Sequence, residues 1–173
     1  MLGDNGRFYV SPELVPLYSK FIETADFITP NQFEAEALSG LSCKYPQKVL
    51  THFHKKGIKT VVITSVETED LDILTLYASS QSEKFRIECP KYLQRLTGTG
   101  DLFCALLVGY MELNDLKMSC LMALSVMQEI ISDTIQRSDS SAYPDLCIIE
   151  NKRMIENPKI SPKLKVYDFI DKE

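Results

Sequence analysis

The hydrophobic and polar positions of this chain alternate between helical and extended spacing through its first two thirds. Three segments carry apolar residues at helical spacing and begin with a residue that favours a helix start: residues 11–23, 31–40 and 46–57. Two short and largely apolar runs accompany them, DFIT at 26–29 and TVVITS at 60–65. Helices that alternate with strands in this way predict an α/β protein rather than an all-helical or all-β one.

The strand predicted at 60–65 differs from the two that follow it. Its β-branched and apolar residues occupy successive positions, which is typical of a strand covered on both faces in a parallel sheet. Residues 71–79 and 83–89 alternate more between polar and apolar positions. We therefore expect these two segments to be antiparallel strands close to an edge of the sheet.

Two long helices are predicted in the last part of the chain, over residues 100–113 and 116–137. The second carries a row of large apolar side chains that we expect to face the core: Leu121, Leu124, Met127 and Ile131. A shorter helix is predicted near residues 146–155.

Composition narrows the class of protein. The 173 residues suit one domain, and the net charge of −5, from 19 basic and 24 acidic side chains without a basic stripe, argues against a nucleic-acid partner. The first ten residues do not resemble a targeting peptide, and no apolar run approaches membrane-spanning length, so we expect a cytosolic protein with no membrane partner. The five cysteines lack CxxC spacing, which favours reduced, mostly buried thiols.

The chain has two histidines, His52 and His54, both in the helix predicted at 46–57. Because they are two residues apart, they point in different directions and cannot both ligate one metal ion. The adjoining Lys55 and Lys56 favour a solvated helix face at this position.

The four residues GTGD, 98–101, stand directly before a long apolar helical run. Glycines let a backbone approach a ligand closely, and the amides and dipole of a helix start favour an anion. The pattern is neither a P-loop nor the GxGxxG of dinucleotide-binding folds. The Asp101 carboxylate would repel a bound phosphate unless it takes part in proton transfer, and the alternative is a plain capped core helix.

A second candidate, TPNQFEAE at 29–36, lies where a predicted strand hands over to a helix. Ligands in open α/β sheets collect beyond the carboxyl ends of the strands. Asn31 and Glu34 would share one face of the first helical turn, where the amide could hydrogen-bond phosphate or water and the carboxylate could hold hydrated Mg²⁺. The alternative is that the two residues only cap the helix.

Four motifs taken together resemble pyridoxal kinases, which are members of the ribokinase-like superfamily. The order and rough spacing of that family are matched by GDNGRFYV, TPNQFEAEALSG, VVITS and LTGTGDLFCALL, and the resemblance continues to IENKRMIENP near the end of the chain. Related hydroxymethylpyrimidine kinases share a TPN element, but they usually have cysteine at the position of Asp101 and lack a GDNGRFYV-like stretch. The resemblance implies a three-layer α/β/α fold with a mostly parallel central sheet.

The same resemblance implies an activity. The family transfers the γ-phosphate of ATP to the 5′-hydroxymethyl group of pyridoxal, pyridoxine or pyridoxamine, giving pyridoxal 5′-phosphate in vitamin B6 salvage. It implies that Asp101 is the general base that meets this hydroxyl of the substrate, and that Gly98, Thr99 and Gly100 form the anion hole for the transferring phosphoryl group.

The resemblance also assigns residues to the cofactors. It assigns Asp4 and Glu34 to Mg²⁺, or to Zn²⁺ or another divalent ion in its place. It assigns Thr29 and Thr64 to a monovalent cation, K⁺ or Na⁺. The residues assigned to ATP come from two motifs and from the segment that flanks the adenine and leads into the glycines: Asn31, Thr64, Ser65, Tyr92, Leu93, Gln94, Arg95, Leu96, Thr97, Gly98 and Thr99.

Members of the family have a long segment before their GDNGRFYV-like stretch, and this chain begins at that stretch. We therefore expect residues 1–173 to form a single partial ribokinase-like domain, truncated at its amino-terminal side, that holds the ATP site and the catalytic base. The first strands of the sheet, most of the ring pocket and an aspartate upstream of Asp4 would be absent.

Two alternatives to an active kinase follow from that expectation. One is a catalytically silent isoform that binds nucleotide or pairs with a full-length kinase, and the other is an incomplete gene model. The family also implies a homodimer.

Overall fold

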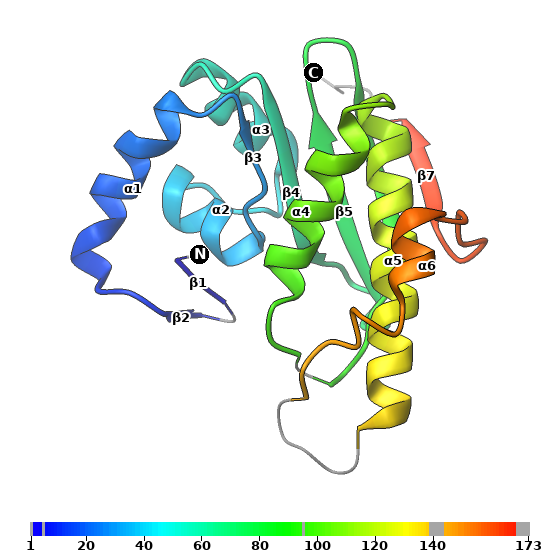
Figure 1. Ribbon diagram of the computed structural model, residues 1–173. Helices are drawn as coiled ribbons and strands as arrows, with labels where there is room; N and C mark the ends of the chain where they lie inside the picture. Colours follow the sequence, from blue (N-terminus) through cyan, green and yellow to red (C-terminus); the bar gives the residue numbers. More distant parts are fainter. Residues whose placement is uncertain (1, 5, 95, 139–143, 169–173) are drawn as a thin grey trace. The chain divides into compact units, whose positions relative to one another are not determined.

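The structure is a computed structural model that describes residues 2–4, 6–94, 96–138 and 144–168 (Figure 1). The chain divides into two compact units, one made of Met1–Glu88 with Val166–Glu173 and the other of Cys89–Lys165. The single partial domain predicted for residues 1–173 stays a prediction. Both helices and strands are present, which confirms the α/β class.

The first unit contains most of the strands. Its elements, with β6 and β7 at the boundary to the second unit, are β1 Gly3–Asp4, β2 Arg7–Phe8, η1 Pro12–Leu14, α1 Val15–Phe21, η2 Ile22–Thr24, β3 Phe27–Ile28, α2 Gln32–Ser39, α3 Pro46–Lys55, β4 Thr60–Glu67, β5 Ile73–Ser79, β6 Lys84–Pro90 and β7 Lys165–Asp168.

The helix predicted at 11–23 is interrupted, because 3-10 turns flank α1 on both sides. Proline lacks an N–H and is tolerated only in the first turn of a helix. Pro16 therefore forces α1 to begin at Val15, and Ser11 caps only the preceding 3-10 turn, without a side-chain hydrogen bond. By contrast, α2 follows its prediction at both ends, since Asn31 caps its start and Gly40, with a φ of 69°, closes it.

The main sheet has the order β3-β4-β5-β6-β7. Strands β3 and β4 are parallel, whereas β4 and β5 are antiparallel. The turn between β5 and β6 is closed by the Ser80 amide, which donates to the Glu83 carbonyl, and so short a turn joins only antiparallel neighbours. The sheet is thus mixed where mostly parallel pairing was expected, and β5 lies in its middle rather than near an edge.

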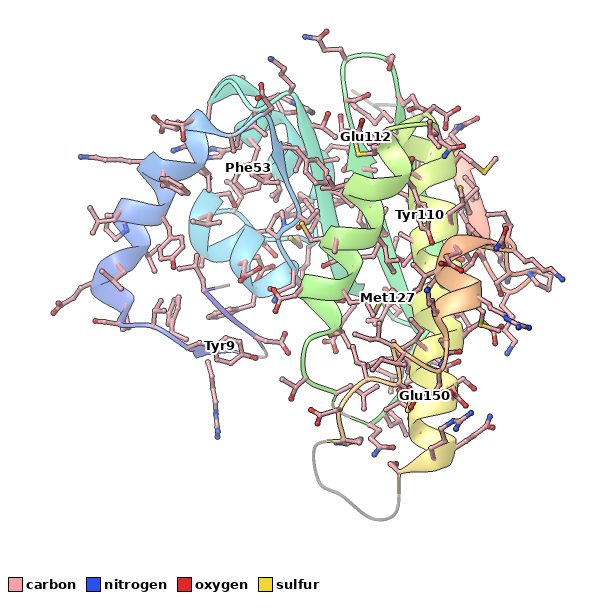
Figure 2. All side chains as sticks on the ribbon, in the orientation of Figure 1. Tyr9, Phe53, Tyr110, Glu112, Met127 and Glu150 are labelled. Carbon is pink, nitrogen blue, oxygen red and sulfur yellow. The ribbon has the colours of Figure 1, made fainter. Side chains whose placement is uncertain are left out.

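The core of the first unit forms between β4 and the helices α2 and α3, with Ile22 of η2 beside them. The run Val61–Ile63 is fully buried, as its unbroken apolar pattern predicted. Phe53 of α3 has no exposed surface and lies among these side chains (Figure 2). Cys43 is also buried here, and the five cysteines of the chain are all free, which confirms the prediction of reduced thiols.

The second unit contains α4 Thr99–Met111, α5 Leu116–Arg137 and α6 Lys152–Glu156. Helices α4 and α5 lie side by side (Figure 1). The Tyr110 hydroxyl of α4 donates a hydrogen bond to the Ile155 carbonyl of α6 (2.7 Å; Figure 2). Helix α6 is shorter than the helix predicted near 146–155 and begins later, because residues 148–151 form turns.

The apolar row predicted on α5 is displaced by about one position. Leu121, Leu124 and Ile131 are only half-buried, and Met127 is the single member of the predicted row that is fully buried. The other buried apolar residues of the helix are Leu116, Cys120, Ala123, Val126 and Ile130. Apolar residues occur in adjacent pairs along this helix, so periodicity alone could not choose between two neighbouring faces.

By length and composition alone, α5 could cross a membrane, contrary to the prediction that no segment would. Half of its most apolar window is buried within the protein, as in the core helix of a globular fold. Its buried residues include the hydroxyl-bearing Ser119, Ser125 and Thr134, each of which donates to a carbonyl of the preceding turn. This pattern favours a core helix.

Candidate functional site

The predicted site residues of the first unit meet where β3 ends beside the second half of β4. Thr29 and Pro30 follow β3, and the Thr64 amide of β4 donates to the Pro30 carbonyl (2.9 Å). Asn31 and Thr64 form an isolated parallel bridge directly beyond the paired part of the two strands. The structure therefore brings together Thr29, Asn31 and Thr64 beyond the carboxyl end of β3, the kind of sheet edge where α/β folds bind ligands.

Asn31 and Glu34 form a reciprocal capping box at the start of α2. The Asn31 Oδ1 atom accepts from the Glu34 amide (2.9 Å), and the Glu34 Oε2 atom accepts from the Asn31 amide (3.2 Å). The predicted cap is thus confirmed, because the chemistry of the first turn determines it locally, but the two residues do not only cap the helix.

The same two side chains also tether the amino-terminal strand. The Leu2 amide donates to Glu34 Oε1 (2.6 Å), and Asn31 Nδ2 donates to the Gly3 carbonyl (2.9 Å). Glu34 is only 8% exposed as a result. These bonds hold β1, and with it Asp4, against the first turn of α2.

Gly3 permits this close approach. A Cβ atom at this position would overlap the Arg7 carbonyl oxygen and lie 2.7 Å from Phe33 Cε1. Strand β2 closes the arrangement from the other side, where Phe8 contacts Phe33 edge to face with ring centroids 4.9 Å apart. The first glycine of the GDNGRFYV motif is therefore required by packing.

The described residues contain no cluster of three or more His, Cys, Asp or Glu side chains that could hold a metal ion. Magnesium, however, keeps several waters and commonly needs only one or two carboxylates. Each carboxylate oxygen of Glu34 accepts a backbone hydrogen bond, from the Leu2 or the Asn31 amide, and a carboxylate oxygen has a second lone pair. Glu34 with Asp4 thus fits a hydrated divalent ion better than a closed metal cage.

Ser65 has an unusual backbone at this edge. Its φ is 56°, and among the described residues it is the only one other than glycine with a positive φ. The pairing of β4 with β5 shifts register between Ile63 and Val66, which marks a bulge around Thr64 and Ser65. Ser65 is exposed and Thr64 half-buried, so the bulge presents both predicted nucleotide residues at the rim of the sheet.

In the second unit, the GTGD motif forms the start of α4. Gly98 is the N-cap residue with a φ of 84°, and its carbonyl accepts from the Leu102 amide (3.0 Å). The amides of Thr99, Gly100 and Asp101 precede the first helical hydrogen bond, and glycine offers no side chain to cap them. Asp101 is exposed in this first turn.

The geometry bears on both interpretations of the GTGD motif. Helix α4 buries Phe103, Leu106 and Leu107 as a core helix does, but no side chain caps its first amides. Three amides and the positive end of a helix dipole next to a solvated carboxylate could hold an anion and exchange a proton near it.

The segment before the motif is partly anchored. The Tyr92 hydroxyl donates to the Gln128 carbonyl (3.4 Å), and Gln94 Nε2 donates to the Ser138 hydroxyl (3.4 Å). Leu93 is 90% exposed, which leaves an apolar side chain free on this segment. Leu96 is half-buried and Thr97 exposed, and Arg95 lies outside the described residues.

The histidine prediction was wrong, because neither ring lies on a solvated face. His54 is half-buried, with Nδ1 2.8 Å from the Ile58 carbonyl oxygen and Nε2 2.8 Å from the Ser79 hydroxyl. His52 is half-buried too, and burial, followed by Lys56 and Lys55, lowers the pKa of its imidazole. The buried Leu50, one turn before His54, was the signal for this orientation.

Gln32 was not predicted as a site residue. Its Oε1 atom accepts a hydrogen bond from the Glu67 amide (2.8 Å), which links the first residue of α2 to the last residue of β4. The two residues are 35 positions apart, so no local pattern could have indicated the contact.

Comparisons with known proteins agree on one family. Residues 1–143 match the family described as phosphomethylpyrimidine kinase. The pyridoxal kinase of Dictyostelium discoideum is 36% identical over 182 residues, which cover 92% of this chain and 60% of that protein.

Two crystal structures resemble the fold. Plasmodium falciparum PdxK with AMP-PNP and PL is 34% identical, with a TM-score of 0.78 over 98% of this chain and 59% of that chain. Leishmania donovani pyridoxal kinase in complex with ADP is 27% identical, with a TM-score of 0.87 over 98% of this chain and 61% of that chain. These matches confirm the ribokinase-like α/β fold, and the chain spans about 60% of the length of the relatives that it matches.

Proposed function

This chain belongs to the phosphomethylpyrimidine kinase family, and we propose that it is an ATP-dependent pyridoxal kinase. The reaction transfers the γ-phosphoryl group of ATP to the 5′-hydroxymethyl group of pyridoxal, pyridoxine or pyridoxamine. The observation that carries the proposal is the start of α4, where an exposed carboxylate follows three helix-start amides that have no helical partner.

The roles at α4 follow from charge and hydrogen bonding. The amides of Thr99 and Gly100, with the positive end of the helix dipole, stabilise the negative charge that spreads over the transferring phosphoryl oxygens. Asp101 accepts the proton of the attacking hydroxyl and orients that oxygen toward phosphorus. The φ of Gly98 turns these amides outward without the cost that a Cβ would impose.

The first unit supplies the proposed nucleotide and cation groups. Asn31, beyond the end of β3, and Thr64 and Ser65, in the bulge of β4, are our candidates for the phosphates of ATP. Glu34 and Asp4 are the candidates for hydrated Mg²⁺, or another divalent ion, which when bound neutralises phosphate charge.

The remaining cofactor assignments are also proposals. Thr29 and Thr64 are the candidates for K⁺ or Na⁺. The segment 92–97 is the candidate for the adenine, which the exposed Leu93 side chain could cover. A homodimer, or a pair with a longer kinase, would appear in sedimentation as a species of higher mass than this chain alone.

An assay of ADP release tests the proposed reaction. Wild-type protein should turn over pyridoxal with ATP, Mg²⁺ and K⁺, and Asp101→Asn should lower kcat by about 10²- to 10⁴-fold, the usual contribution of a general base. ATP affinity, measured by calorimetry, should change little, because Asn keeps the size of the side chain.

Asp115→Asn is the matched control. Asp115 caps α5 in the same unit, and asparagine caps equally well, so this variant should keep full activity. Activity that survives Asp101→Asn would remove Asp101 from the role of base. Hydroxymethylpyrimidine, tested in parallel, should be the poorer substrate because Asp101 stands where kinases of that compound usually have cysteine.

The alternative of a silent nucleotide-binding protein makes a different prediction. It requires tight binding of ATP with Mg²⁺ and no turnover of any B6 vitamer. The absence of ATP binding by the wild-type chain would contradict both the kinase and the silent form.

A further inference from the structure

Within β4, one serine has a backbone conformation that serine rarely adopts. Ser65 has a φ of 56°, in a bulge that interrupts the pairing of β4 with β5. A residue with a Cβ stays in the left-handed region only where surrounding contacts hold it there. The contacts on both sides of Ser65 therefore determine whether it can present its backbone and hydroxyl in this way.

Just before Ser65, the backbone of residues 30–31 holds β4. The Thr64 amide donates to the Pro30 carbonyl (2.9 Å), and Asn31 bridges Thr64. These contacts use main-chain atoms and fix the residue immediately before Ser65.

Just after Ser65, the side chain of Gln32, the first residue of α2, reaches past the bulge. Gln32 Oε1 accepts from the Glu67 amide at 2.8 Å, two residues after Ser65. Ser65 thus lies between two residues, Thr64 and Glu67, whose amides are bonded to residues 30–32. The second bond depends on the length and the acceptor atom of the Gln32 side chain.

The sheet resists a larger rearrangement. Val66 is 3% exposed and pairs with Thr75 of β5 beyond the bulge. Removing the bulge would shift the following residues by one position and turn Val66 out of the core. Loss of the Gln32 contact should therefore loosen Thr64 and Ser65 locally and leave the fold intact, especially since the contact itself is exposed.

We propose that Gln32 is a positioning residue for nucleotide binding, because its hydrogen bond to the Glu67 amide holds the left-handed Ser65 bulge in the shape that receives ATP. This inference rests on the proposed function, in which Thr64 and Ser65 contact the nucleotide. Gln32 does not touch the nucleotide in this account and acts only through the bulge.

The direct test is the ATP dependence of pyridoxal phosphorylation by the Gln32→Ala chain. The loss of one hydrogen bond that orders the site should raise KM for ATP about 5- to 10-fold. The kcat value should stay within about twofold, since Asp101 and the GTGD amides are unaffected. Gln47→Ala is the matched control, because Gln47 also stands half-buried in the first turn of a helix, and KM should not change.

A double-mutant cycle separates positioning from general weakening. Glycine adopts a positive φ without a Cβ penalty, so Ser65→Gly should make the bulge independent of its clamp. In that background Gln32→Ala should change KM by less than about twofold, and additive effects would overturn the proposal.

Hydrogen exchange in the nucleotide-free protein supplies an independent readout. The Glu67 amide should exchange faster in Gln32→Ala and regain its protection in Gln32→Glu, whose carboxylate keeps an acceptor oxygen. Unchanged exchange in Gln32→Ala, or an unchanged KM, would overturn the role of Gln32 alone. A wild-type chain that does not bind ATP would instead refute the proposed function and this inference with it.

Discussion

Asn31 offers the sharpest test of how the site is built, because its side chain performs two separable tasks. Its Oδ1 atom caps α2 by accepting from the Glu34 amide, and its Nδ2 atom tethers β1 by donating to the Gly3 carbonyl. Asn31→Ala removes both bonds, whereas Asn31→Asp keeps a capping oxygen and loses the donor.

The magnitudes follow from these contacts. Loss of an N-cap costs about 1 kcal/mol. Loss of the tether leaves the carbonyl of the buried Gly3 without this donor, which costs about 1 to 2 kcal/mol. We expect Asn31→Ala to lower the free energy of unfolding by about 2 to 3 kcal/mol and Asn31→Asp by about 1 to 2 kcal/mol.

Urea unfolding followed by circular dichroism measures the totals, and hydrogen exchange assigns them. The Glu34 amide should lose protection only in Asn31→Ala, while the Leu2 amide, next to the tether, should lose it in both variants. Asp115→Ala is the control, because it removes the cap of α5 without a tether and should cost about 1 kcal/mol.

Two results would refute this reasoning. If Asn31→Asp is as stable as the wild type, the bond to Gly3 contributes nothing to the fold. If Asn31→Ala costs no more than Asp115→Ala, Asn31 is only a helix cap, and Asp4 must be held by other means.

Three further predictions concern the core, the amino-terminal turn and a buried thiol. Phe53→Ala should lower the free energy of unfolding by about 3 to 5 kcal/mol in urea unfolding, because the ring is fully buried and leaves a cavity; a loss below about 1 kcal/mol would contradict its place in the core. Gly3→Ala should expose the β1 and β2 amides to hydrogen exchange, since the new Cβ would lie 2.7 Å from Phe33, whereas Gly109→Ala has open space inside α4 and should stabilise the protein by up to about 1 kcal/mol. Burial, and then a neighbouring glutamate, raises the pKa of Cys43 to about 12, so its contribution to stability is complete below the ordinary thiol pKa and is lost as pH rises from there toward the folded value. The urea midpoint should accordingly fall above about pH 9, and less steeply in Cys43→Ala; equal slopes would show that the thiol is not protected.

Much of the local structure could be predicted because its causes lie within a few residues. Asn31 and Gly40 delimit α2 by cap chemistry, and the bounds of α5 match their prediction at both ends. Pro16 could have predicted the interruption before α1, since a proline inside a continuous helix would clash with the preceding turn. The GTGD motif likewise contains its own helix start.

The arrangement of the site residues in the first unit, by contrast, depends on contacts between segments that are distant in the sequence. Glu34 was predicted for a cation, yet its oxygens also hold the Leu2 amide 32 positions away. His54 could not be assigned to a half-buried position without Ser79, a residue of β5. The alternating pattern of residues 71–79 did predict an antiparallel strand, but it could not place β5 in the middle of the sheet, because alternation reports burial and not the order of strands.

The sequence by itself determined the ends of α2 and α5 and the placement of Asp101 beside three helix-start amides, because each of these depends on neighbours within about one turn. Only the tertiary structure decided that Asn31 and Glu34 tether β1, that Ser65 takes a left-handed backbone and that Gln32 accepts from the Glu67 amide 35 positions away. The physical reason is that such a tether or strained φ forms only where distant segments contact each other in the folded protein. The local pattern of hydrophobic and polar residues does not specify those contacts.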